Sequence, residues 1–69
     1  MKWYTEEGDP KSGKTTRLIA KANTAVAEGK RVIFRNVEIS AWALAAKGLD
    51  SRVIVVVAAP GDQEAVGIE

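Results

Sequence analysis

Five consecutive apolar residues, Val53 to Val57, place the strongest constraint on what this chain folds into. All five are β-branched, and such residues favour an extended strand. Because no polar residue alternates with them, the run is typical of a strand buried on both faces, as in a parallel sheet covered by helices. We therefore predict a central strand over 52–59 that ends at Pro60 and Gly61.

The preceding segments alternate between strand-like and helical patterns. Aromatic and β-branched residues predict two further strands. Apolar residues at helical spacing predict two helices, which end at Gly29 and Gly48. The predicted order is strand 2–6, helix 14–28, strand 32–36, helix 39–47 and strand 52–59, followed by a tail, 60–69, without a predicted element.

This β-α-β-α-β order predicts a single α/β domain, 1–69, with a three-stranded parallel sheet. We place the most apolar strand, the third, in the centre and the half-polar first strand at an edge, which gives the order 2-3-1. Right-handed crossovers then step in opposite directions along the sheet, so one helix covers each face in a three-layer sandwich. Trp42 is interpreted as a core residue, because it shares a helix face with Ile39 and Ala46.

Composition excludes several function classes. The 69 residues include no cysteine and no histidine, which rules out disulfides, zinc fingers and histidine-based catalysis. With 10 basic and 9 acidic side chains, the net charge of +1 argues against strong overall attraction to nucleic acid or membranes. The sequence shows no secretory apolar segment and no apolar run long enough to span a bilayer. We expect a cytoplasmic protein.

One motif carries chemistry. Residues 8–15 read Gly-Asp-Pro-Lys-Ser-Gly-Lys-Thr and match G-x-x-x-x-G-K-[ST] between a predicted strand and a predicted helix. Gly8 and Gly13 permit a backbone whose N–H groups point inward as an anion nest, and the start of the helix adds further unpaired N–H groups. Lys14 is expected to reach the β- and γ-phosphates of a nucleotide, and Thr15 to bind Mg²⁺ through its hydroxyl.

The predicted phosphate site includes the loop and the first helical residues: Gly8, Asp9, Pro10, Lys11, Ser12, Gly13, Lys14, Thr15 and Thr16. A structural alternative is a glycine-containing turn capped by Ser12 or Thr15, with its lysines solvated. Lys11 and Arg17 either raise the local positive potential or are ordinary surface charges. Thr16 is either a neighbour of the metal or a simple first-turn residue.

With this motif continuing as Thr16-Arg17-Leu18-Ile19, the chain resembles the P-loop NTPase superfamily over about residues 2–59. Its N-terminal part is similar to thymidine kinases and helicase-type ATPase cores, in which a glycine-lysine pair like Gly29-Lys30 separates the first helix from an apolar second strand. The resemblance implies binding of ATP or GTP with Mg²⁺. The chain departs from the superfamily in its short length and in its half-polar first strand.

Hydrolysis is left open, because it also needs a positioned water and a metal-orienting acid. In the superfamily that acid usually ends a later apolar strand, whereas the nearest acids here are Asp62 and Glu64 in the tail. Glu38 follows the second strand, either as a neighbour of the loop or as a helix-start carboxylate. Arg35 or Arg52 of a second copy is either an arginine finger or a surface residue.

Two functions compete with nucleotide binding. One is binding of nucleic-acid backbone phosphates. The other is a non-catalytic interaction module derived from an NTPase, which would pair through its sheet edges with a second copy or a larger partner. Trp3 and Tyr4 either stack on a base or pack on the core. The nucleic-acid hypothesis is motivated by Lys11, Lys14, Arg17 and Lys21.

Overall fold

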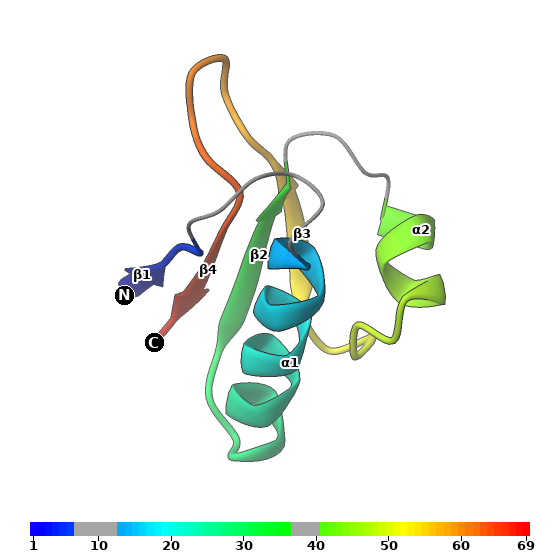
Figure 1. Ribbon diagram of the computed structural model, residues 1–69. Helices are drawn as coiled ribbons and strands as arrows, with labels where there is room; N and C mark the ends of the chain where they lie inside the picture. The colour runs from blue at the N-terminus through cyan, green and yellow to red at the C-terminus, as the bar shows by residue number, and fades with distance from the viewer. Residues whose placement is uncertain (7–12, 37–40) are drawn as a thin grey trace.

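A computed structural model describes residues 1–6, 13–36 and 41–69 of the chain (Figure 1). Each predicted strand and helix has a counterpart there, and a further strand, β4, lies within the tail 60–69. The bounds are β1 Lys2–Tyr4, α1 Lys14–Ala27, β2 Val32–Asn36, α2 Ala41–Ala46, β3 Ile54–Val57 and β4 Ala65–Ile68.

The four strands of the described residues form one mixed sheet in the order β1-β4-β2-β3. β4 is antiparallel to both of its neighbours, so that Val66 lies between Tyr4 of β1 and Phe34 of β2. Among neighbouring strands, only β2 and β3 are parallel. The predicted three-stranded parallel sheet of order 2-3-1 is therefore wrong. β1 does lie at an edge, but the apolar third strand lies at the opposite edge instead of in the centre.

The tail supplies a central strand because its residues are small or apolar. Ala65 and Val66 are completely buried. At Gly67 a Cβ would lie 2.6 Å from the Met1 Sδ and 3.0 Å from the Trp3 ring, so a larger residue would have to displace both side chains. A four-residue strand that contains glycine has a weak signal in the sequence, because glycine is depleted in strands. The sequence prediction missed β4 for this reason.

Both helices lie on the same side of the sheet (Figure 1). The predicted sandwich with one helix on each face is wrong, and the strand order explains why. The crossovers from β1 to β2 and from β2 to β3 step in the same direction along the sheet. Right-handed crossovers that step in one direction place their helices on one face.

The core lies between α1, the neighbouring face of the sheet and the α2 crossover. α1 contributes five buried residues from one face, at the helical spacing that the sequence predicted. Both helices end as predicted at glycines of positive φ, Gly29 and Gly48, where the backbone N–H groups bond back in the Schellman pattern. The main core cluster is Leu18, Ile19, Ala22, Ala25, Val26, Val32, Phe34, Leu44, Leu49, Val53 and Val66.

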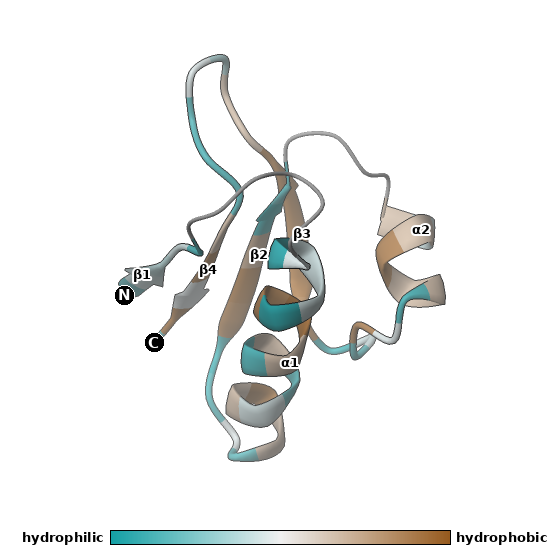
Figure 2. Cartoon of the chain, viewed as in Figure 1, coloured by the Kyte–Doolittle hydropathy of each residue, from teal (hydrophilic) through white to brown (hydrophobic). Residues whose placement is uncertain are grey.

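The opposite face of the sheet is open in the described part of the chain. Ile54 and Val56 of β3 point to that face, beside Ile33 and Arg35 of β2, and Ile54 is 52% exposed. Figure 2 shows β3 in the hydrophobic colour along its length. The run that the sequence predicted to be buried on both faces is thus an edge strand with one exposed face.

Trp42 was predicted to be a core residue, and that prediction is also wrong, since 77% of the residue is exposed. α2 instead buries Leu44, two positions further along the helix and therefore on a different face. Within the described ranges, no helix combines the length and the apolar character that a membrane span requires.

Candidate functional site

The described part of the motif forms the start of α1. Gly13 is the N-cap residue, with φ 83° and ψ 23°, a left-handed conformation that glycine adopts without steric cost. Its carbonyl oxygen accepts the first helical hydrogen bond, from the Arg17 N–H at 3.0 Å. The next N–H groups belong to the first turn of a 14-residue helix, where the macrodipole favours an anion.

The motif falls only partly within the described residues. Gly8, Asp9, Pro10, Lys11 and Ser12 lie outside them, as does Glu38. The remaining predicted site residues begin α1, where Lys14 and Thr15 are half-buried and Thr16 is exposed.

A contact between α1 and β4 adds an acidic residue to this end of the helix. The Thr15 hydroxyl donates a hydrogen bond of 2.9 Å to Oε1 of Glu64, which immediately precedes β4. These residues are 49 positions apart in the sequence. The sequence named Glu64 as one of the nearest acids but could not place it beside Thr15, because it gave no sign that the tail returns to the sheet.

A side chain of β2 holds the backbone next to Glu64 in place. Arg35 of β2 donates a 2.9 Å hydrogen bond from Nε to the carbonyl oxygen of Gln63. Its guanidinium also lies 4.9 Å from the centre of the Trp3 ring. In this arrangement Arg35 supports the segment that carries Glu64, and it is not a free surface arginine.

The start of α1, the end of β2 and the start of β4 meet at one end of the sheet (Figure 1). Asn36, the last residue of β2, is buried at 6% exposure and accepts a backbone hydrogen bond of 2.8 Å from Ala58. In open α/β sheets, ligands bind beyond the carboxyl ends of parallel strands. The candidate site thus has the location that this rule favours, although its sheet is mixed.

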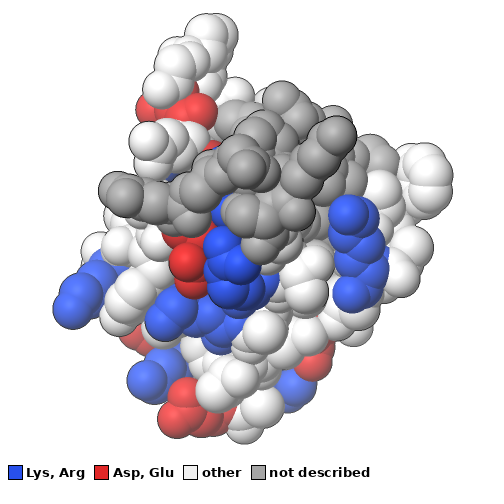
Figure 3. Space-filling model, viewed as in Figure 1, with Lys and Arg blue, Asp and Glu red and all other residues white. Residues whose placement is uncertain are grey.

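Basic residues gather over α1, but acidic residues lie among them (Figure 3). Arg17 Nε lies 3.4 Å from Oε2 of Glu6. The Lys21 ammonium lies 4.4 Å from the centre of the Tyr4 ring, a cation–π distance. Tyr4 therefore packs against α1 rather than standing free to stack on a base.

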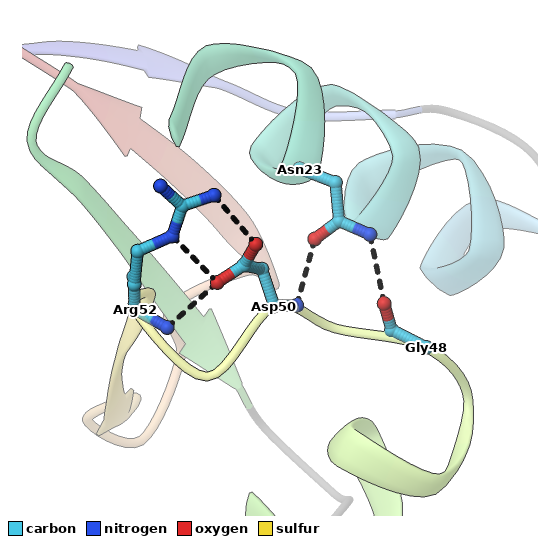
Figure 4. Close-up of polar contacts among 4 residues, drawn as sticks. All are labelled: Asn23, Gly48, Asp50 and Arg52. Atoms are coloured by element: carbon cyan, nitrogen blue, oxygen red, sulfur yellow. Dashed lines mark hydrogen bonds and ion pairs between the residues drawn. The ribbon is translucent and has the colours of Figure 1, made fainter. Parts of the chain in front are cut away.

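The opposite end of α1 carries a different polar cluster, the Asn23 clamp, made of Asn23, Gly48, Asp50 and Arg52 (Figure 4). Asn23 donates 2.8 Å from Nδ2 to the Gly48 carbonyl and accepts 2.8 Å from the Asp50 N–H. Two guanidinium nitrogens of Arg52 bond the Asp50 carboxylate at 3.1 Å and 2.9 Å. These hydrogen bonds and that of the Arg52 N–H lower the pKa of Asp50 to about 2.

This clamp changes the interpretation of Arg52. An arginine finger must be free to reach a phosphate on another molecule. Arg52 is already engaged in a bidentate pair within its own chain, and it would have to leave Asp50 to act in that way.

An open groove of about 410 Å³ runs beside α1, further from the motif. It mixes two lysines, one glutamate and apolar residues. It is lined by Tyr4, Ala20, Lys21, Thr24, Ala25, Glu28, Lys30 and Ile68. No group of three or more acidic residues with metal-binding geometry occurs in the part of the chain that the structure describes.

Searches of protein-family models, of curated proteins and of solved structures found no match to this chain. The fold therefore defines the class: a small α/β protein with a four-stranded mixed sheet and two helices in the described residues.

Proposed function

We propose that this protein binds the phosphates of a nucleoside triphosphate, ATP or GTP, together with Mg²⁺, through the motif at 8–15. The observation that carries the proposal is the 2.9 Å contact between the Thr15 hydroxyl and the Glu64 carboxylate at the start of α1. In the proposal, Glu64 takes the role of the metal-orienting acid, because its carboxylate accepts a hydrogen bond from the Thr15 hydroxyl. The fold gives the proposal no family support, so it rests on the motif and on this geometry.

The oxygen pair suits the proposed metal. Mg²⁺ prefers oxygen ligands, and neighbouring ligands of an octahedral ion stand about 3 Å apart. The oxygens of Thr15 and Glu64 have nearly this separation, at 2.9 Å. In the proposal, these two residues hold the ion, which would supply charge neutralisation to the bound phosphates.

The chain's own groups divide the remaining work. N–H groups at the start of α1 bind phosphate oxygens, and Lys14 balances the charge of the outer phosphates. Gly13 holds the left-handed conformation at the N-cap and has no side chain that could cap the N–H groups of the first turn. We propose binding rather than catalysis, because hydrolysis also requires a residue that positions water. A cytoplasmic location belongs to the same proposal, since triphosphates are held there.

Calorimetric titration with ATP and GTP, with and without Mg²⁺, tests the proposal. Replacing Lys14 by alanine should weaken binding about tenfold to a hundredfold, the usual loss for a hydrogen bond to a charged group. Lys47→Ala is the matched control, because it removes an exposed lysine at the end of α2. Equal affinities for the wild type and Lys14→Ala would refute nucleotide capture by the motif.

A second pair of variants tests the metal ligands. Glu64→Gln should remove most of the Mg²⁺ dependence while retaining metal-free binding, because it keeps the shape but loses the charge. Glu28→Gln, an exposed change at the far end of α1, should leave that dependence intact. If nucleotide does not bind in any condition, the non-catalytic interaction module becomes the better hypothesis.

A further inference from the structure

The two edges of the sheet differ in their protection against pairing. β1 has three residues, and one of them is a lysine. Short edge strands and edge lysines are common devices that prevent a sheet from adding another strand. β3 lies at the other edge and reads Ile-Val-Val-Val, with no charge, proline or glycine. Val57 is 85% exposed.

The register shows which backbone groups of β3 point away from β2, toward an edge that no described strand occupies. The Ala58 N–H donates to the Asn36 carbonyl on β2. Amide groups alternate in direction along a strand, so those of Ile54 and Val56 also face β2. The N–H and C=O groups of Val55 and Val57 therefore face the open edge.

We propose that β3 pairs with β3 of a second copy, antiparallel and about a two-fold axis at Val56, so that two sheets join into one. In this register Val55 of each copy lies opposite Val57 of the other. Within each of these two pairs, the N–H of each residue donates to the C=O of the other. A two-fold axis at Val55 would instead pair Val57 with Val53, whose N–H already donates to the Asp50 carbonyl.

Charge also favours a second copy as the partner. Identical uncharged strands place no like charges opposite each other within the pairing. A domain of 69 residues also gains from association, because so small a chain buries a limited core. This inference is independent of nucleotide binding.

The absence of cysteine in the chain permits a direct test of the register. Val56→Cys should form an intermolecular disulfide rapidly under mild oxidation, because residues in a non-hydrogen-bonded antiparallel pair lie about 4.5 Å apart, within disulfide reach. Ile54→Cys is the matched control on the same face, and Val55→Cys reports the rejected register. Both should cross-link much more slowly. Equal rates for all three, or a fastest rate for Val55→Cys, would overturn the proposal.

Sedimentation velocity tests the association without a cross-link. The wild type should show a dimer that increases with concentration. Val57→Pro removes an edge N–H that faces away from β2 and has no acceptor among residues 1–6, 13–36 and 41–69, so it should give a monomer. Val57→Thr keeps that N–H and should still dimerise. Circular dichroism of the two variants verifies that both are folded. A wild type that stays monomeric at every soluble concentration would refute the pairing.

Discussion

The two helices cover the same face of the sheet but are held there in different ways. α1 buries five residues against the sheet, and α2 buries only Leu44. The crossover that contains α2 is also attached through the Asn23 clamp, which joins its C-terminal end to α1 by hydrogen bonds. α1 is therefore fixed by five buried residues of its own, whereas α2 has one and relies in addition on buried Leu49 and on the polar clamp that follow it.

This difference separates the helix that carries the proposed phosphate site from the helix that we expect to open more readily. α1 carries the candidate phosphate site at the end that contacts Glu64, so the site is built on the most firmly packed helix. α2, with one buried residue and an exposed tryptophan, has less apolar contact to lose than α1 when it detaches. Segments with few buried contacts open at lower free energy than the rest of a domain.

The largest predicted effect compares a core leucine in each helix. Leu18→Ala should destabilise the whole protein by about 2–5 kcal/mol, the usual cost of a cavity at a fully buried leucine. Leu44→Ala should cost less in global stability, because detachment of α2 limits the loss. Urea unfolding measures the global cost, and hydrogen exchange shows whether only α2 is released.

Equal losses of global stability in the two leucine variants would contradict the contrast between the helices. Trp42→Ala provides a control in α2, since removal of an exposed side chain usually changes stability by less than about 0.5 kcal/mol.

A smaller effect is expected from the clamp. Asn23→Ala removes one donor and one acceptor to the α2 crossover and should cost about 1–3 kcal/mol. Amides of α2 and Leu49 should exchange faster, while those of β2 and β4 should change little. Asn23→Asp keeps the acceptor for the Asp50 N–H and loses the donor to Gly48, so it separates the two bonds. Uniformly faster exchange would show that the clamp supports the whole fold.

The smallest expected effect is a change with pH. The folded-state pKa of Asp50, about 2, lies below its ordinary value of 3.8. Asp50 therefore stabilises the fold above about pH 4, and this contribution is lost as the pH falls toward 2. Asp50→Asn should flatten the acid limb of the stability curve. Arg52→Lys should flatten it partly, because lysine cannot form the bidentate pair. An unchanged acid limb in Asp50→Asn would exclude this role.

Local patterns predicted the elements better than they predicted the topology. The spacing of apolar residues located α1 and its buried face, and the glycines at 29 and 48 marked both helix ends. These features depend on neighbours within a few positions. The strand order depends on β4, whose short glycine-containing sequence gave no signal, and without β4 the apolar run of β3 was placed in the centre.

For the candidate site too, local sequence indicated the residues of one segment but not the contact with a distant one. The sequence predicted that Gly13, Lys14 and Thr15 belong to a phosphate loop, and this stays a prediction; the structure shows that they stand at the start of α1. It could not identify Glu64 as the neighbour of Thr15, because that contact requires the returning strand. Trp42 was misinterpreted because the short helix buries Leu44 and directs the tryptophan outward.

The central position of β4 has a consequence for the order of events during synthesis. The ladder between β1 and β4 pairs Lys2 with Ile68, residues near opposite ends of the sequence. Proteins emerge from the ribosome with their N-terminal part first. β1, α1, β2 and β3 are therefore all made before the strand that joins β1 to the rest of the sheet. Until β4 is made, β1 lacks its sheet partner among the described strands, and the face of α1 that packs on β4 is uncovered.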